Sequence, residues 1–188
     1  MTLLASYIDN FTGVKALCIG DIMLDRFLYG KVNRISPEAP VPVFFFEREK
    51  QMLGGAGNTA ANMAALGCRV TFVGIVGRDE NGRKLTSLLS AAGVHSHLLR
   101  LENYPTIVAG NNHLLRADQE EVLPIIEDLL PRFERILERA VRSADIVVLS
   151  DYNKGLLTPV TAQLIIRLCS KYDKPVIIDP KGSDYTKY

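Results

Sequence analysis

The chain has 188 residues, a length typical of a single domain, and 47% of them are hydrophobic and 23% charged. This composition excludes a disordered chain, a collagen-like repeat and a disulfide scaffold. The 22 Lys and Arg residues nearly balance the 21 Asp and Glu residues, which leaves a net charge of +1. Such a balance gives no electrostatic footprint for nucleic acid or an anionic membrane, and we expect neither as a partner.

Three cysteines, Cys18, Cys68 and Cys169, are far apart and lie in or beside apolar runs. Because no C-x-x-C pair occurs, the sequence predicts three buried free thiols rather than a zinc site or a disulfide framework. Residues 1–12 lack the pattern of a signal peptide, and no apolar run approaches the length needed to span a bilayer. We therefore expect a cytoplasmic protein.

Four short apolar runs rich in β-branched residues predict strands that are buried on both faces, as in parallel sheets. These runs are residues 15–19, 70–76, 146–149 and 176–178. Between them, four stretches with helical patterns predict helices over residues 58–66, 81–92, 128–142 and 158–172. The alternation of strands and helices predicts an α/β fold with a mostly parallel sheet flanked by helices.

Two pairs of β-prone segments interrupt this alternation. The first pair is residues 27–33 and 41–47, and the second is residues 107–109 and 113–117. A parallel α/β core has no position for such strands, so we interpret the segments as a small β-lid beside the sheet. No internal repeat or linker divides the chain, which indicates one domain.

Aspartates mark the ends of the four predicted core strands. They are Asp21, Asp79, Asp151 and Asp179. Ligands of open α/β sheets bind outside the carboxyl ends of the strands, so the pattern indicates a ligand site at that edge. Aspartate also occurs in loops for turn chemistry alone, and this alternative remains open for each residue.

A glycine-rich segment that includes Gly54 and Gly55 precedes the first long helix. Glycines at such a position let a ligand approach the N–H groups of the first helical turn. Asn58 and Asn62 are four residues apart and therefore share one face of this helix. Two adjacent amides suit a polyol, which has donors and acceptors on neighbouring carbons. The structural alternative is that Asn58 caps the helix and Asn62 bonds a neighbouring loop.

The same segment matches a dinucleotide fingerprint at Gly55, Gly57 and Ala60. That fingerprint requires a strand that leads directly into the glycines. Here the apolar run 43–46 is separated from them by five polar residues, 47–51. The sequence therefore disfavours a dehydrogenase, although Asp79 lies at a tolerable distance for the ribose-binding acid.

Several motifs resemble those of the ribokinase (pfkB) family of carbohydrate kinases. They are GDIMLD at residues 20–25, GGAGN at residues 54–58, ALG at residues 65–67 and VGIVGRDENG at residues 73–82. Three further strings resemble the heptose 7-phosphate kinase branch of this family. They are RISPEAPVPV at residues 34–43, LSDYNKG at residues 149–155 and IDPKG at residues 178–182. The likeness extends over nearly the whole chain.

The resemblance implies a ribokinase-like fold in which a β-lid, here about residues 27–47 and 107–117, closes over a sugar. It implies that Asp25, Gly54 and Gly55 hold sugar hydroxyls with Asn58 beside them. Asp151 would line the sugar and metal site. Arg34 is our candidate for binding the phosphate that the substrate already carries, since a guanidinium can bind that group in bidentate fashion.

The implied activity is ATP- and Mg²⁺-dependent phosphorylation of D-glycero-D-manno-heptose 7-phosphate at its anomeric hydroxyl, in ADP-heptose and lipopolysaccharide core biosynthesis. A homodimer through the β-lid is a further expectation. Alternatives are a kinase for another sugar or a nucleoside, and a non-catalytic sugar-binding module.

The family's G-x-G-D motif, which carries the catalytic base, and its N-x-x-E motif, associated with Mg²⁺–ATP, do not occur in this sequence. The segment at Thr106–Ile107 is also shorter than in heptose kinases and lacks their Lys and Arg. We therefore expect residues 1–188 to form the N-terminal part of one kinase domain, with the base downstream of Tyr188.

Overall fold

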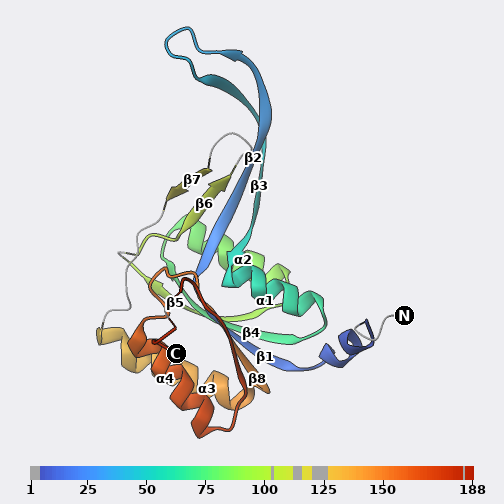
Figure 1. Ribbon diagram of the computed structural model, residues 1–188, viewed down its shortest axis with the longest axis vertical. Coiled ribbons are helices and arrows are strands. Elements are labelled where there is room, and N and C mark those ends of the chain that lie inside the picture. Colours follow the sequence, from blue (N-terminus) through green and yellow to red (C-terminus); the bar gives the residue numbers. More distant parts are fainter. Residues whose placement is uncertain (1–4, 103, 112–115, 120–126, 184) are drawn as a thin grey trace.

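The computed structural model describes residues 5–102, 104–111, 116–119, 127–183 and 185–188. Within these ranges, five parallel strands form the main sheet in the order β5-β4-β1-β8-β9 (Figure 1). Their bounds are β1 (Lys15–Gly20), β4 (Arg69–Gly77), β5 (His95–Leu101), β8 (Ile146–Ser150) and β9 (Val176–Asp179). Four of them confirm the prediction. The fifth, β5, was missed because its polar residues leave no continuous apolar run.

Helices cover both faces of the main sheet, as the sequence predicted (Figure 1). On one face lie α1 (Ala56–Ala65) and α2 (Glu80–Ala91), and on the other lie α3 (Leu130–Ser143) and α4 (Pro159–Lys171). The 3₁₀ helix η1 (Ala5–Phe11) precedes β1, and η2 (Glu127–Leu129) leads into α3. The start of α4 follows from its sequence, because Thr158 forms a capping box with Thr161 and proline occupies the first turn.

Alternate residues of β1 divide the core into two halves. Leu17 and Ile19 pack in a cluster with α3 and α4, whereas Cys18 packs in a cluster with α1 and α2. This period of two is what a strand covered on both faces requires. The free thiols of Cys18 and Cys169 are buried as predicted, but Cys68 is only partly buried. Burial raises the pKa of Cys18 to about 12.

A second sheet, in the order β3-β2-β6-β7, forms the lid. Its strands are β2 (Ile22–Ile35), β3 (Pro42–Gly55), β6 (Val108–Asn111) and β7 (Arg116–Gln119). The long β2–β3 hairpin rises from the body as an arm (Figure 1). Residues 112–115 of the second predicted hairpin lie outside the described residues.

The lid strands are longer than the sequence indicated, and two expectations change as a result. First, β3 reaches Gly55 directly, so the glycines do follow a strand after all. That strand pairs antiparallel with β2 in the lid, however, and a dinucleotide fingerprint needs a parallel βαβ unit. Second, Asp25 precedes the predicted lid segment 27–33, yet it belongs to β2, where it is half-buried opposite Met52. It therefore stands on a paired strand at the root of the lid.

Asp79 has a structural role at the N-terminus of α2. Its carboxylate accepts hydrogen bonds from the backbone N–H of Gly82 at 2.6 Å and from the N–H and hydroxyl of Thr106 at 2.8 and 2.6 Å. Burial alone would raise the pKa of Asp79, but the bonds from Thr106 and Gly82 outweigh it and hold the pKa below its ordinary value. Asp79 thus joins α2 to the segment that leads into β6.

We predict that Asp79→Ala lowers the free energy of unfolding by about 2 kcal/mol, through the lost helix cap and the unpaired Thr106 groups. Because folding lowers the pKa of Asp79, its contribution is present above the ordinary pKa of aspartate and disappears as the pH falls below it. Denaturant unfolding between pH 7 and pH 3 measures both effects. Glu80→Gln, one residue away, is the control, and equal losses in the two variants would contradict the assignment.

Candidate substrate site

The order of strands in the main sheet reverses beside β1. From β1 the chain adds β4 and β5 on one side, and it returns to place β8 and β9 on the other. Since β1 and β8 are parallel neighbours, their carboxyl ends meet at one edge of the sheet. Ligands of open α/β sheets bind in the crevice at such a switch point. The predicted site residues can be placed relative to this crevice.

Asp21, directly after β1, is the central polar group of the crevice and is buried. Its carboxylate accepts hydrogen bonds from the backbone N–H groups of Tyr152 (3.1 Å), Lys154 (3.0 Å) and Leu156 (3.0 Å) in the loop after β8. Its carbonyl oxygen accepts the N–H of Ala56, the first residue of α1. Burial, with the negative charge of Asp151, raises the pKa of Asp21 although these three hydrogen bonds lower it. Asp21 therefore connects β1, the β8–α4 loop and α1.

Gly54 and Gly55 end β3 beside the two acids at the root of the lid. A Cβ atom at Gly54 would collide with the carboxylate of Asp25, and one at Gly55 would lie 2.5 Å from the carbonyl oxygen of Asp21. Gly55 also has a backbone φ of +56°, a value that residues with a Cβ atom rarely adopt. The glycines therefore let β3 turn into α1 in direct contact with Asp21 and Asp25.

Asn58 and Asn62 are both exposed on α1, four residues apart as predicted. The structural alternative is wrong, because Gly55 is the N-cap residue and no side chain caps this helix. Within the described ranges neither amide side chain has a hydrogen-bond partner. The first turn of α1 also touches the end of β8, where the hydroxyls of Thr59 and Ser150 lie 3.3 Å apart.

Asp151 lies at the expected edge, directly after β8, but its carboxylate is enclosed. One oxygen accepts the N–H of Asn153 at 2.6 Å, and the other contacts the ammonium of Lys187 and the hydroxyl of Tyr188. Its side chain has no exposed surface. In this structure Asp151 therefore has no face open to a sugar.

Arg34 is not brought to the crevice. It lies on the exposed far part of β2, nine residues beyond Asp25, which is about 30 Å along an extended strand. Its guanidinium lies 5.7 Å from the ring centre of Phe45 on the same arm. Within one chain, Arg34 and Asp25 cannot contact the same sugar phosphate, which corrects the expectation that Arg34 completes this chain's own site.

Tyr152 is a residue of the crevice that the sequence analysis did not assign. Its ring is half-buried, and the ammonium of Lys181 lies 6.0 Å from its centre. Burial, together with the negative charges of Asp179 and Asp25, raises the pKa of Tyr152. Its phenol therefore lies within the field of both acids. The LSDYNKG string contained this tyrosine, but only the folded loop shows which way it faces.

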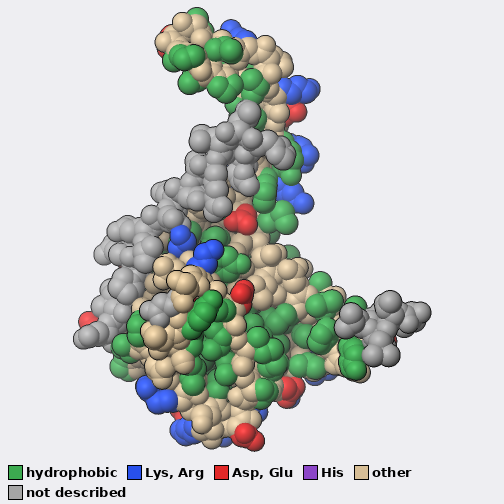
Figure 2. Space-filling model, viewed as in Figure 1, with side chains coloured by type: hydrophobic (Ala, Val, Ile, Leu, Met, Phe, Trp, Pro, Cys, Tyr) green, Lys and Arg blue, Asp and Glu red, His purple; other side chains and the backbone are tan. Residues whose placement is uncertain are grey.

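Asp179 ends β9, and it is exposed. Its carbonyl oxygen accepts the N–H of Asp151 at 3.0 Å. Of the four strand-end aspartates, the side chains of Asp21, Asp79 and Asp151 thus bind backbone N–H groups, as the structural alternative proposed. Charged side chains of both signs lie where the lid meets the body (Figure 2).

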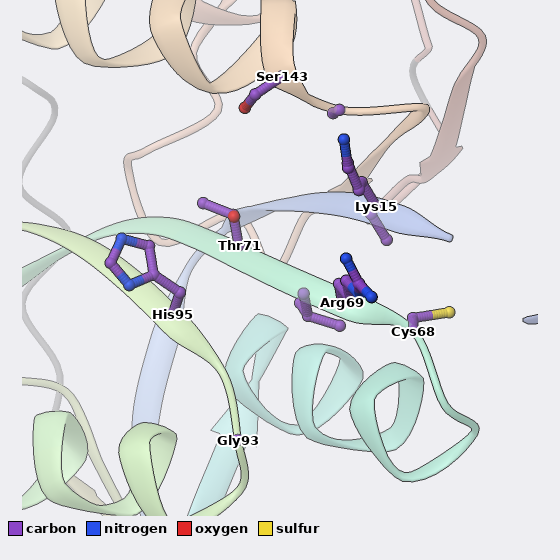
Figure 3. A pocket seen from close by; sticks show the side chains of 10 residues that line it. Lys15, Cys68, Arg69, Thr71, Gly93, His95 and Ser143 are labelled. Atoms are coloured by element: carbon purple, nitrogen blue, oxygen red, sulfur yellow. The ribbon is translucent and has the colours of Figure 1, made fainter. Parts of the chain in front are cut away.

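Two hollows lie away from this crevice. One, of about 460 Å³, opens at the amino ends of β1, β4 and β5, where Lys15, Arg69 and His95 line it with Ser143 (Figure 3). The other, of about 440 Å³, lies between the root of the lid and the start of α2, and Arg26, Gln51 and Arg83 contribute to its lining. Because ligands of α/β sheets bind at the carboxyl ends of the strands, the crevice remains our candidate site.

The described residues do not form a ready-made metal site, because no three His, Cys, Asp or Glu side chains among them gather closely enough to hold an ion. Nor does any helix in the described ranges have the length and hydropathy to cross a bilayer; the longest, α3, has 14 residues.

Comparison with known proteins identifies similar sequences. A family model described as pfkB family carbohydrate kinase matches residues 14–188. The Bifunctional protein HldE of Caulobacter vibrioides is 46% identical over 185 residues, which are 95% of this chain and 38% of that protein. The Bifunctional protein HldE of Paramagnetospirillum magneticum is 43% identical over 194 residues, 100% of this chain and 40% of that protein. The chain thus spans about two fifths of these relatives' length.

Solved structures show the same fold. A carbohydrate kinase from Agrobacterium tumefaciens superposes with a TM-score of 0.69 at 20% identity, over 88% of this chain and 53% of that one. Arabidopsis thaliana ribokinase, complexed with ribose and ATP, gives a TM-score of 0.62 at 19% identity, over 92% and 55% of the two chains. The predicted ribokinase-like architecture is confirmed.

We predict that Asp21→Asn lowers the free energy of unfolding by about 3 kcal/mol, because the amide NH₂ would face backbone N–H donors in a buried position. Denaturant unfolding measures the loss. Asp145→Asn is the control, since among the described residues its carboxylate accepts one N–H, that of Lys15, in an exposed position. If both variants lose the same stability, Asp21 is not the residue that holds the crevice together.

Proposed function

The chain belongs to the pfkB family of carbohydrate kinases, and we propose that it forms the sugar-binding part of an ATP-dependent heptose kinase. The substrate in this proposal is D-glycero-D-manno-heptose 7-phosphate, and the product is the 1,7-bisphosphate formed by phosphorylation of the anomeric hydroxyl. The reaction would serve ADP-heptose and lipopolysaccharide synthesis in the cytoplasm. One observation supports the proposal: Gly54 lies against the Asp25 carboxylate at the root of the lid, and Gly55 leads into α1, whose first turn reaches the end of β8 at the switch point.

Each of these residues has a task that its position supports. The Asp25 carboxylate accepts hydrogen bonds from sugar hydroxyls, and the absence of a Cβ at Gly54 leaves that carboxylate in its place beside β3. Asn58 and Asn62 present amide donors and acceptors from the next element. These groups bind and orient the sugar. By fixing the attacking oxygen in position, they accelerate the reaction. The lid stands over them and limits the access of water.

Nucleotide and magnesium ion belong to the proposal, but the described residues do not fit them. The carboxylates of Asp21 and Asp151 are already occupied by protein donors, and no cluster of three possible ligands is present in the described ranges. Bound Mg²⁺–ATP supplies the phosphoryl group and the positive charge that kinases use. No step of that transfer is assigned to the described residues, and the base that accepts the proton is not among them in this proposal.

The far part of the lid supports the proposed homodimer. Its exposed hydrophobic side chains gather at the tip of the arm (Figure 2). They are Val32, Ile35, Val41, Phe45 and Phe46. A patch of this kind on a projecting arm is typical of a protein interaction site. Pairing of two lids would also carry Arg34 toward the partner molecule, where it could reach a phosphate that it cannot reach in its own chain.

We predict that the protein phosphorylates the heptose 7-phosphate, and that Asp25→Asn raises KM for the sugar about tenfold or more through a lost charged hydrogen bond. KM for ATP should not change. Gly54→Ala should have the same effect, because its Cβ displaces the carboxylate while leaving the acid present. Steady-state kinetics with both substrates varied measures these values, with Glu38→Gln on the exposed lid connection as the control.

Two results would contradict this proposal in different ways. A preference for an unphosphorylated sugar or a nucleoside would place the protein in another branch of the family. Sugar binding by calorimetry without any consumption of ATP would instead indicate a non-catalytic binding module.

We predict that the protein is a dimer in sedimentation equilibrium and that Phe46→Ser shifts it toward the monomer. Ile177→Ser, on the free edge of β9, is the matched control, since the two side chains are 59% and 55% exposed. A monomer at all concentrations, or equal effects of the two substitutions, would exclude the lid as the interface.

A further inference from the structure

The Asp151 carboxylate forms a buried ion pair that the proposed function does not use. Lys187 and Tyr188 contact the same carboxylate oxygen, and the side chains of Asp151 and Lys187 are 0% and 16% exposed. Burial and the hydrogen bond to Asp151 raise the pKa of Tyr188, so its hydroxyl keeps the proton that it donates. A buried carboxylate needs such partners, because leaving it unpaired costs much of a domain's stability.

Both Lys187 and its backbone are held by further contacts. The ammonium also donates to the carbonyl oxygen of Leu157 at 3.2 Å. The carbonyl oxygen of Lys187 accepts from the side-chain amide of Gln163, on α4, at 3.2 Å. The C-terminal segment, residues 180–183 and 185–188, is thereby fastened to the β8–α4 loop and to the first turns of α4.

The loop fastened in this way leads to the candidate sugar site. Asp151 accepts the N–H of Asn153, and Asp21 accepts the N–H of Tyr152 from the other side. Burial and the negative charges of Asp179 and Asp25 raise the pKa of the Tyr152 phenol, and the ammonium of Lys181 in the C-terminal segment lies 6.0 Å from its ring centre. A displacement of Asp151 would therefore move Tyr152 relative to Asp25.

We propose that Lys187 and Tyr188 are positioning residues, which fix the Asp151 carboxylate and thereby set the β8–α4 loop and Tyr152 against the sugar-binding Asp25. Neither residue needs to touch the sugar. This inference rests on the proposed function, and it assigns to Asp151 an internal role in place of direct sugar contact. It adds residues of the C-terminal segment to the set on which sugar affinity depends.

The chain contains a matched arrangement that lacks the proposed role. On the surface between α3 and α4, the Glu138 carboxylate accepts from the ammonium of Lys171 at 2.8 Å and from the hydroxyl of Tyr172 at 2.5 Å. As at Asp151, a lysine and the tyrosine that follows it in the sequence contact the same carboxylate oxygen. There the lysine is 60% exposed and the acid 37%. Such an exposed pair contributes little to stability. The contacts that the structure describes for Lys171 and Tyr172 join the end of α4 to α3 rather than to the crevice.

The test is a set of substitutions in the protein, read by melting temperature and by steady-state kinetics. Lys187→Met should lower the melting temperature and raise KM for the sugar phosphate about tenfold, with KM for ATP unchanged, because the sugar side of the crevice is displaced. Lys187→Arg should restore most of both properties. Tyr188→Phe should act in the same direction but less strongly. Lys171→Met and Tyr172→Phe should change neither quantity.

The double variant Lys187→Met with Asp151→Asn separates positioning from stability. It removes the unpaired charge, so its melting temperature should recover relative to Lys187→Met, while KM for the sugar phosphate stays raised. Recovery of the wild-type KM would overturn the proposal and leave a purely structural ion pair. If the unaltered protein phosphorylates no sugar, the proposed function fails, and the positioning role fails with it. In that case a lower melting temperature of Lys187→Met than of Lys171→Met would still show that the buried ion pair stabilises the fold.

Discussion

The arrangement of the candidate site depends on a carboxylate buried at the end of the central strand. A buried acid at Asp21 is tolerated only if its oxygens are satisfied, and here the backbone N–H groups of three alternate residues of one loop, Tyr152, Lys154 and Leu156, satisfy them. That loop must therefore curl over the end of β1, which requires the left-handed backbone at Asn153 and Gly155. Because Asp21 also accepts the N–H of Ala56, the start of α1 is fixed by the same residue.

The lid is continuous in sequence with the residues around Asp21. β2 begins at Ile22, directly after Asp21, and β3 ends at Gly55, directly before α1. Ile22, Leu24 and Leu53 at its root belong to the core cluster, whereas the far part of the arm is exposed. The root is thus packed into the core of the body, and Asp25 lies on it opposite Met52. The bidentate pair of Arg26 with Glu49, at 2.6 and 2.9 Å, braces the next position along the hairpin.

Two carboxylates at neighbouring strand ends are neutralised in different ways. Asp21 is satisfied by backbone dipoles of one loop, and Asp151 by a lysine and a tyrosine that arrive from the C-terminal segment. The partners of Asp21 come from the loop at the switch point itself. The partners of Asp151 come from the segment after β9, so the position of the β8–α4 loop depends on that segment. Asp25 lies at the root of the lid, where the proposed function assigns it a role in binding the sugar.

The sequence by itself determined the fold class, four core strands, the four helices and the existence of a lid, because these depend on periodicity and on local cap and turn chemistry. It also located the glycines and the two asparagines of α1. It missed β5 and the full length of β2 and β3, whose polar residues interrupt the apolar pattern. Only the tertiary structure decided the roles of the acids, because the burial and the partners of Asp21, Asp79 and Asp151 come from segments distant in sequence. The structure was also needed to place Arg34 far from Asp25. The two residues lie far apart because both belong to one extended strand, β2, whose full length the sequence did not show.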